Sequence, residues 1–203
     1  MLRVGLTGGV ACGKSTVGHL LAARGAHFLQ ADTLAHQLYQ PGQPVYHAVV
    51  ERFGREILNS NGAIHRARLA NAAFPDRIGE LNAIVHPAVI EAQNLWLVEC
   101  ERRDPHGIAV IEAALIIEAG AAGHFDKLVV VTCDFEHKVE RYARRAEVSL
   151  EVARAEVLRR SAAQLSDEEK TLRADYVIDN SGAPEATATQ VTDVWLKLQC
   201  CTR

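Results

Sequence analysis

An excess of charge of one sign is missing from this sequence. Lysine and arginine number 22 against 25 acidic residues, which gives a net charge of -3. Such a balance produces no general field that would hold nucleic acid or an anionic membrane. No apolar run approaches the roughly 20 residues that are needed to cross a bilayer. We therefore expect no nucleic-acid or membrane partner, and any anion must be bound by a local site.

Metal-ligating cysteine patterns are missing too. The chain has five cysteines, an odd number, and they show neither CxxC nor Cys/His ligand spacing. This usage argues against structural zinc and predicts plain thiols in a reducing, cytoplasmic setting. Repeats and low-complexity tracts are also absent. A chain of 203 residues with 48% apolar content is long enough for one sizeable core, or for one core plus a small inserted subdomain.

Five short apolar segments predict the strands of one sheet. Helical spacing follows the first segment, with apolar residues at Val17, Leu20 and Leu21. Alternation of strands and helices predicts an α/β fold with a parallel sheet covered on both faces. The expected strands are residues 2–7, 26–30, the start of 108–117, 127–133 and 175–180.

Two regions carry only helical patterns. Residues 45–103 read as helical pieces with breaks at "NSNG" and at "HP" (His86 and Pro87), after which a long amphipathic run begins. Residues 135–146 and 150–163 predict two helices, and the capping-box pattern "SDEE" at 166–169 predicts a third. A closing helix is expected to have Pro184 near its first turn. Only the region 45–103 is a candidate for an inserted subdomain.

The stretch "GLTGGVACGKST", residues 5–16, connects the first strand to the first helix. It matches GxxxxGK[ST], the Walker A loop, in which backbone N–H groups surround the β-phosphate of a nucleotide. Lys14 is expected to reach the β- and γ-phosphates, and the Ser15 hydroxyl to ligate magnesium. Cys12 is expected to be a small filler that contributes its N–H. The predicted nucleotide contacts of this stretch are Gly8, Gly9, Ala11, Cys12, Gly13, Lys14, Ser15 and Thr16.

The motifs that are missing around this loop narrow the class of nucleotide enzyme. Neither NKxD nor a DxxG switch is present, which argues against a GTPase, and the chain is short for an oligomeric ATPase. A small-molecule kinase is therefore the leading class. Such an enzyme needs a group that orients the acceptor hydroxyl, a metal site and cations for the transferred phosphoryl group.

Acidic and basic residues provide candidates for these three tasks. Asp32 follows the second strand and would align the acceptor hydroxyl, while it could also cap the next helix. Glu112 ends the third strand and would hold magnesium through a water, unless it is an ordinary strand-end acid. Glu118 is a weaker metal candidate. Arg141 and Arg145 share one helical face, which is either solvated or part of a lid that excludes water from the reaction.

Several blocks in their order resemble the dephospho-CoA kinase family over nearly the whole chain. They include "GLTGGVACGKSTV", "LNAIVHP", "IEAALIIEAG", "TCDFEHKVERYARR" and "ADYVIDNSG". The resemblance implies ATP- and Mg²⁺-dependent phosphorylation of the ribose 3′-hydroxyl of dephospho-CoA, the last step of coenzyme A synthesis. It implies one P-loop kinase domain with a five-stranded parallel sheet, active as a monomer or small homo-oligomer. Its core would span about 1–40, 105–135 and 174–203, its helical CoA-binding region about 41–104 and its lid about 136–173.

The resemblance also assigns residues to roles. Catalysis would depend on Asp32, Lys14 and Arg145, and Arg141 and Asn180 would join the nucleotide site. Read without the family, His86 is a helix-start or packing histidine. The substrate-side residues would be Thr7, Asp32, Arg66, His86 and Leu115, and the metal would lie at Ser15 and Glu112.

This sequence departs from the family pattern in three places. "QAD" stands where the family often has "DAD", "EAALIIE" stands where "DxPLLFE" is frequent, and "RRSAAQ" has serine in place of an apolar residue. Two alternatives stay open at this point. One is another small-molecule P-loop kinase that acts on a nucleoside monophosphate or a sugar acid, and the other is a regulatory protein that senses or hydrolyses ATP.

Overall fold

The protein is described by a computed structural model, which covers residues 1–202. The chain divides into two compact units, which we describe separately. The first contains Met1–Gln30 together with the chain from Cys100 onward, and the second is Ala31–Glu99. These boundaries fall close to residues 30 and 100, whereas the sequence places the start and end of the helical region near 41 and 104.

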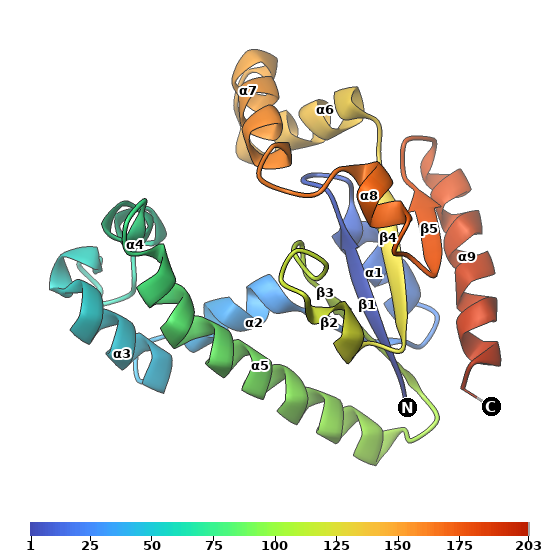
Figure 1. The fold of residues 1–203 in the computed structure, drawn as a ribbon, viewed down its shortest axis with the longest axis horizontal. Helices are drawn as coiled ribbons and strands as arrows, with labels where there is room; N and C mark the ends of the chain where they lie inside the picture. Colours follow the sequence, from blue (N-terminus) through green and yellow to red (C-terminus); the bar gives the residue numbers. More distant parts are fainter. Residues whose placement is uncertain (203) are drawn as a thin grey trace. The chain divides into compact units, whose positions relative to one another are not determined.

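The first unit is built on a five-stranded sheet (Figure 1). Its order is β2-β3-β1-β4-β5, and every pairing between neighbouring strands is parallel. Apolar side chains fill both faces of the central strands, as expected for a covered parallel sheet. The predicted fold class is therefore confirmed. The strands are β1 (Leu2–Gly8), β2 (His27–Gln30), β3 (Ile108–Glu112), β4 (Lys127–Thr132) and β5 (Tyr176–Asp179).

Alternate residues of β4 belong to different cores. Val129 and Val131 pack with helices α1 (Lys14–Ala22) and α9 (Pro184–Cys200) on one face of the sheet. Leu128 and Val130 face the opposite side, where the segment 113–125, with η2 (Ala121–His124), and residues 165 and 174 cover the sheet. This period of two is the geometry of a strand buried on both sides. The sheet is thereby packed on both faces along β4.

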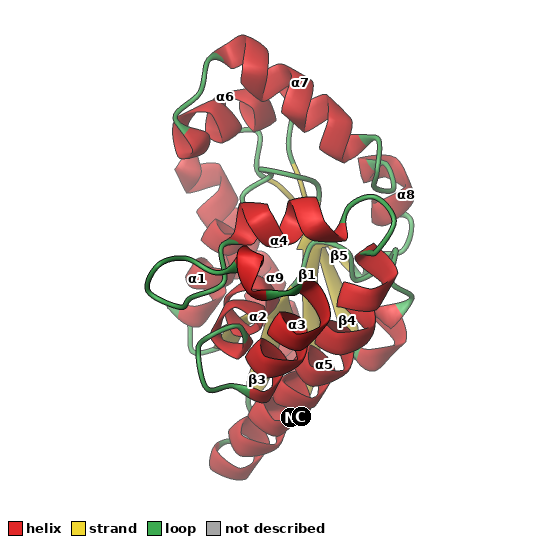
Figure 2. Ribbon diagram, turned by 90° about the vertical axis from the view of Figure 1, so that its left-hand side faces the viewer, coloured by secondary structure: helices red, strands yellow, loops and turns green. Residues whose placement is uncertain are grey.

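The segment that follows β4 is helical. It contains α6 (Phe135–Ala146), α7 (Leu150–Ser161) and α8 (Asp167–Thr171), and α6 and α7 pack against each other beyond the sheet (Figures 1 and 2). The predicted capping box is present, since Ser166 and Glu169 bond each other's backbone N–H groups. Pro184 begins α9 as expected. Within residues 1–202, no helix combines the length and apolarity of a membrane span.

The second unit has a core of its own. It contains α2 (Ala31–Leu38), α3 (Pro44–Phe53), η1 (Arg55–Ile57), α4 (Arg66–Ala73) and most of α5 (Ile78–Arg103). Val49, Phe53, Ile57 and Leu69 are among its buried side chains. The only β-type pairing described here is one isolated bridge between Leu58 and Ile64. This agrees with the helical pattern of the sequence.

The course of α5 differs from the prediction. The sequence places a break at Pro87 and a helix after it, but α5 begins at Ile78 and continues through Pro87. A proline inside a helix costs about 3 kcal/mol or more, because one backbone hydrogen bond is lost. Here Val85 on one side of the proline and Val89 on the other both pack into the core of this unit. Apolar burial on both sides offsets the lost hydrogen bond and keeps the helix continuous.

Candidate active site

The loop of residues 9–13 turns sharply between β1 and α1. Gly8 has φ 147° and Gly13 has φ 90°, and Ala11 is also left-handed with φ 54°. A Cβ atom on Gly8 would lie 2.1 Å from the Val131 carbonyl oxygen, and one on Gly13 would lie 2.1 Å from the Asn180 side-chain nitrogen. Both positions therefore require glycine for conformation and for space. The outcome is the strand–loop–helix arrangement that the Walker A pattern predicts.

Lys14 is the first residue of α1. Its Nζ donates to the carbonyl oxygens of Gly8 at 3.1 Å and Gly9 at 2.9 Å. The ammonium therefore lies over the loop and next to the N-terminus of a helix, where positive charge is concentrated. This combination favours a polyanion.

Asn180 and Arg141 both reach the Cys12 carbonyl oxygen. The Asn180 amide donates to it at 2.8 Å and Arg141 Nη1 at 3.3 Å, while Arg141 Nη2 donates to the Asn180 carbonyl at 2.8 Å. Thr187 completes the arrangement by donating to Asn180 Oδ1 at 2.8 Å. The structure thus brings two predicted nucleotide residues to the loop. It does not do so for Arg145, which is exposed and stacks 5.5 Å from the Tyr142 ring.

Ser15 and Glu112 meet as the sequence predicts. The Ser15 hydroxyl donates to Glu112 Oε1 at 3.0 Å, and Gln30 donates from its side-chain amide to Glu112 Oε2 at 2.9 Å. Gln30 and Glu112 are two of the positions where the sequence departs from the family pattern, and they are hydrogen-bonded to each other. A hydroxyl and a carboxylate are the hard oxygen donors that suit Mg²⁺. Among residues 1–202 no group of three or more His, Cys, Asp or Glu forms a closed metal cage.

Thr7 and Leu115 lie at the ends of β1 and β3. Thr7 is fully buried, and its hydroxyl donates to the Ala114 carbonyl at 3.2 Å. This bond fixes the start of the segment that follows β3. Leu115, the next residue, is exposed. Both predicted substrate residues therefore lie at the edge of the sheet where Glu112 also lies.

Cys12, within the loop, and Cys133, near it, are not activated as nucleophiles. Burial raises the pKa of Cys12, although Lys14 lies close enough to oppose the shift. Burial also raises the pKa of Cys133 to about 11. A thiol of raised pKa is a poor nucleophile at neutral pH. Cys12 is therefore a filler of the loop, as the sequence indicates.

The remaining predicted residues belong to the second unit. Asp32 is the second residue of α2, which begins directly after β2, and its side chain is exposed. Arg66 is the first residue of α4 and is also exposed. His86 is exposed within α5, so the expectation that it starts or packs a helix is wrong. The roles of Asp32, Arg66 and His86 toward a substrate stay predictions.

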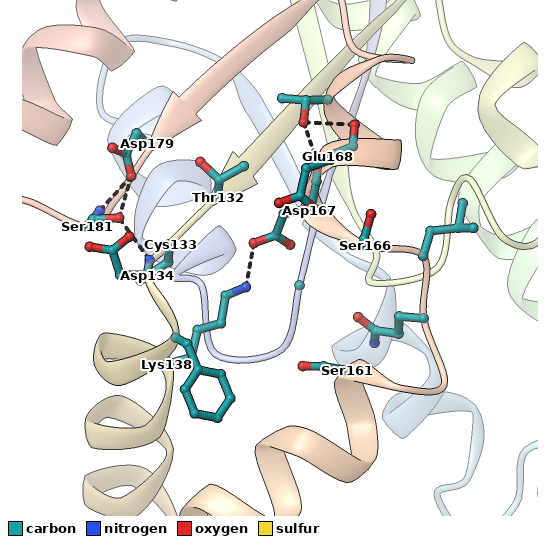
Figure 3. Close-up of a pocket in the computed structure, with 15 residues that line it drawn as sticks. Thr132, Cys133, Asp134, Lys138, Ser161, Ser166, Asp167, Glu168, Asp179 and Ser181 are labelled. Carbon is teal, nitrogen blue, oxygen red and sulfur yellow. Dashed lines mark hydrogen bonds and ion pairs between the residues drawn. The ribbon is translucent and has the colours of Figure 1, made fainter.

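The sequence did not single out two ion pairs of the first unit. Lys138 Nζ lies 2.5 Å from Asp167 Oδ2 (Figure 3). Lys170 Nζ lies 3.0 Å from Glu118 Oε1. Lys138 lies in a stretch of mixed charge, residues 136–160, and Asp167 lies inside the "SDEE" capping box. Nothing in their spacing marks them as partners, because tertiary structure brings them together.

Comparison with known proteins decides the family. The model of the dephospho-CoA kinase family matches residues 2–185. The chain belongs to the dephospho-CoA kinase family. A dephospho-CoA kinase of Geobacter sulfurreducens is 41% identical over 196 residues, which cover 96% of this chain and 97% of the relative. That of Aquifex aeolicus is 38% identical over 201 residues and covers 98% of both chains. The resemblance inferred from the sequence is thus confirmed.

Solved structures agree with this membership. A crystal structure from Thermus thermophilus has a TM-score of 0.80 at 30% identity and covers 97% of both chains. Dephospho-CoA kinase from Campylobacter jejuni has a TM-score of 0.68 at 22% identity, covering 99% of this chain and 98% of the other, and therefore supports the fold alone.

Proposed function

We propose that this dephospho-CoA kinase family member transfers the γ-phosphoryl group of ATP to the ribose 3′-hydroxyl of dephospho-CoA, which gives coenzyme A. The observation that carries the proposal is the family match over residues 2–185, on a chain that has the phosphate-binding loop in place. The transfer is the last step of coenzyme A biosynthesis.

The phosphates of ATP bind at the loop. Backbone N–H groups of residues 9–13 and the N-terminus of α1 offer hydrogen-bond donors and partial positive charge. Lys14 exchanges its two carbonyl contacts for the β- and γ-phosphates. Arg141 and Asn180 hold the loop by donating hydrogen bonds to the Cys12 carbonyl oxygen. We also assign them to the border of the nucleotide site. The adenine is assigned to the side of the loop where Arg141 and Asn180 lie.

Ser15 and Glu112 are the residues that would hold Mg²⁺, because their hydroxyl and carboxylate meet at 3.0 Å. A divalent ion at these two residues would supply positive charge that offsets the negative charge of the ATP phosphates. Gln30 keeps the Glu112 carboxylate oriented, because it donates to the oxygen that Ser15 leaves free. An amide at position 30 also avoids a second negative charge beside Glu112.

The residues that we assign to acceptor-side roles are Thr7, Asp32, Arg66, His86 and Leu115. Asp32 aligns the 3′-hydroxyl, and a weak base suffices because proton transfer comes late in a loose transition state. Arg66 and His86 contact the CoA moiety. His86 also borders an apolar surface of α5 with Ile90 and Leu95, which suits the uncharged arm of that substrate.

The segment from α6 to α8 serves as the lid in this proposal. It carries Arg145, whose guanidinium approaches the transferred phosphoryl group when the segment closes. Closure excludes water, which competes with the acceptor for the phosphoryl group. The protein acts in the cytoplasm, in keeping with five free cysteines, as a monomer or small homo-oligomer.

The alternatives receive less support. Shikimate kinases share the fold, as the Aquifex aeolicus structure does with a TM-score of 0.51 at 14% identity, but identity this low says nothing of the substrate. The match of a kinase family model to residues 2–185 argues against a regulatory protein that only senses ATP.

A coupled assay tests the proposal. Purified protein, ATP and Mg²⁺ are incubated with dephospho-CoA, and the position of the new phosphate on the ribose is determined by NMR. Wild type is expected to phosphorylate the 3′-hydroxyl, and Lys14→Ala to lose at least about a hundredfold in kcat/KM. Asp32→Asn is expected to lower kcat while ATP binding is kept. Preference for a nucleoside monophosphate or shikimate as acceptor would reject the proposal.

A further inference from the structure

One ion pair joins the beginning of α6 to the beginning of α8. Lys138 lies in the first turn of α6, and Asp167 is the first residue of α8. The Lys138 ammonium lies 2.5 Å from Asp167 Oδ2 (Figure 3). Residues 139–166, which include the whole of α7, lie between the two partners in the chain. The ion pair therefore closes the base of this segment.

The same ion pair lies against the phosphate-binding loop. A Cβ atom built on Gly9 would be 3.0 Å from Asp167 Oδ1 and 3.2 Å from Lys138 Nζ. Gly9 does not have a positive φ, unlike Gly8 and Gly13. A side chain at Gly9 would therefore press on both members of the ion pair, which would have to shift by a few tenths of an ångström. Three separate parts of the chain, the loop and both ends of the segment, contact one another here.

Water has little access to this contact. The Lys138 side chain is 10% exposed and that of Asp167 is 25% exposed. Charges in such a place interact more strongly than a surface pair, and removal of one partner leaves the other uncompensated. The Glu136–Arg154 ion pair of the same segment provides a contrast, because its side chains are 64% and 46% exposed. It offers a matched control that does not touch the loop.

We propose that the Lys138–Asp167 ion pair is a positioning device that fixes the phosphate-binding loop at Gly9 and ties the base of the lid to it. This rests on the proposed function, since it assigns a task to residues of that site. In this role neither side chain needs to contact a reacting atom. Both act through the loop, whose N–H groups must point inward before the phosphates arrive. The effect of losing the pair should therefore appear in nucleotide binding and not in acceptor binding.

Titration calorimetry with ATP and Mg²⁺, in the absence of acceptor, provides the test. Lys138→Met and Asp167→Asn are each expected to weaken ATP binding about tenfold. The double variant is expected to lose less than the product of the two single losses, because each single variant already breaks the pair. The KM for dephospho-CoA should change less than about twofold in all three. Arg154→Met should bind ATP as wild type does, and Lys138→Arg should restore most of the affinity.

Several outcomes would overturn the inference. If Asp167→Asn tightens ATP binding while Lys138→Met weakens it, the pair acts through net charge and not through position. Unchanged ATP affinity in both, or an equal loss for ATP and acceptor, would also reject it. Thermal unfolding is measured first, and Lys138→Gln replaces Lys138→Met if that variant does not fold. Wild-type phosphorylation of a different acceptor would reject the proposed function and leave this inference standing.

Discussion

The ammonium of Lys170 lies 3.0 Å from Glu118 Oε1, and no part of the Lys170 side chain reaches solvent. Lys170 also donates to Gln164 at 3.3 Å, and Glu118 Oε1 accepts from the Leu165 N–H at 3.2 Å. Glu118 Oε2 is buried without a hydrogen-bond partner among the described residues. Glu118, a weak metal candidate by sequence, instead holds the segment before and within α8 against the residues that follow β3.

Lys170→Met is expected to lower the free energy of unfolding by about 3–5 kcal/mol, because the Glu118 carboxylate would stay buried without a counter-charge. Urea denaturation measures the change. Lys127→Met removes a partly exposed ion pair with Asp175 and should lower the free energy of unfolding much less than Lys170→Met does. A loss of similar size for both variants would contradict the burial argument. Adding Glu118→Gln to Lys170→Met should restore part of the stability.

Asn180→Ala is expected to weaken ATP binding and to lower the free energy of unfolding by about 1–3 kcal/mol. The substitution removes the donor to the Cys12 carbonyl and leaves the Thr187 hydroxyl without its acceptor. Thr187→Val keeps the contact with the loop and should affect stability more than ATP affinity. Calorimetry and denaturation on both variants check this. Equal ATP affinities in the two variants would mean that Asn180 does not maintain the loop.

Glu112→Gln is expected to raise the Mg²⁺ concentration that gives half-maximal activity about tenfold. In the proposed metal site the carboxylate provides the negative charge next to Ser15, and an amide does not carry that charge. Initial rates at fixed ATP over a range of Mg²⁺ measure the effect. Glu101→Gln, which alters a surface contact with Arg3, is the control. An identical Mg²⁺ dependence in wild type and Glu112→Gln would remove Glu112 from the metal site.

Iodoacetamide at pH 8 is expected to modify the exposed Cys200 and Cys201 first. Burial raises the pKa of Cys12 and of Cys133, the latter to about 11, so neither carries much thiolate at this pH. Raising the pH toward 11 should increase the thiolate fraction of Cys133, because its deprotonated form becomes populated there. Peptide mass spectrometry follows each site, with unfolded protein as the control. Labelling of Cys12 at the rate of Cys201 would show that the loop opens.

Local patterns account for much of what the sequence predicted correctly. The loop of residues 9–13 depends on glycines that are adjacent in the chain, and the capping box at Ser166 involves residues three apart. Such features can be predicted because the residues that form them are close together in the sequence. Pro87 is the opposite case, because its local signal for a helix break is outweighed by packing of distant residues in the second unit.

Long-range pairings were beyond the sequence. Gln30 and Glu112 were noted as two separate departures from the family pattern, yet the structure joins them by a hydrogen bond of 2.9 Å. They come from neighbouring strands in register, since Gln30 pairs with Glu112 across β2 and β3. Strand order decides such contacts, and a single sequence does not reveal it. The contact between Lys138 and Asp167 likewise depends on how α6 and α8 pack, which a single sequence does not reveal either.

Gly13 shows how tightly the loop restricts evolutionary change. The space where a Cβ atom would stand is filled by the Asn180 amide, and φ is 90°. A smaller residue at position 180 would open that space, but a side chain on this left-handed backbone would still be strained, so the second substitution rescues the first only in part. Drift at Asn180 therefore gives position 13 little new freedom.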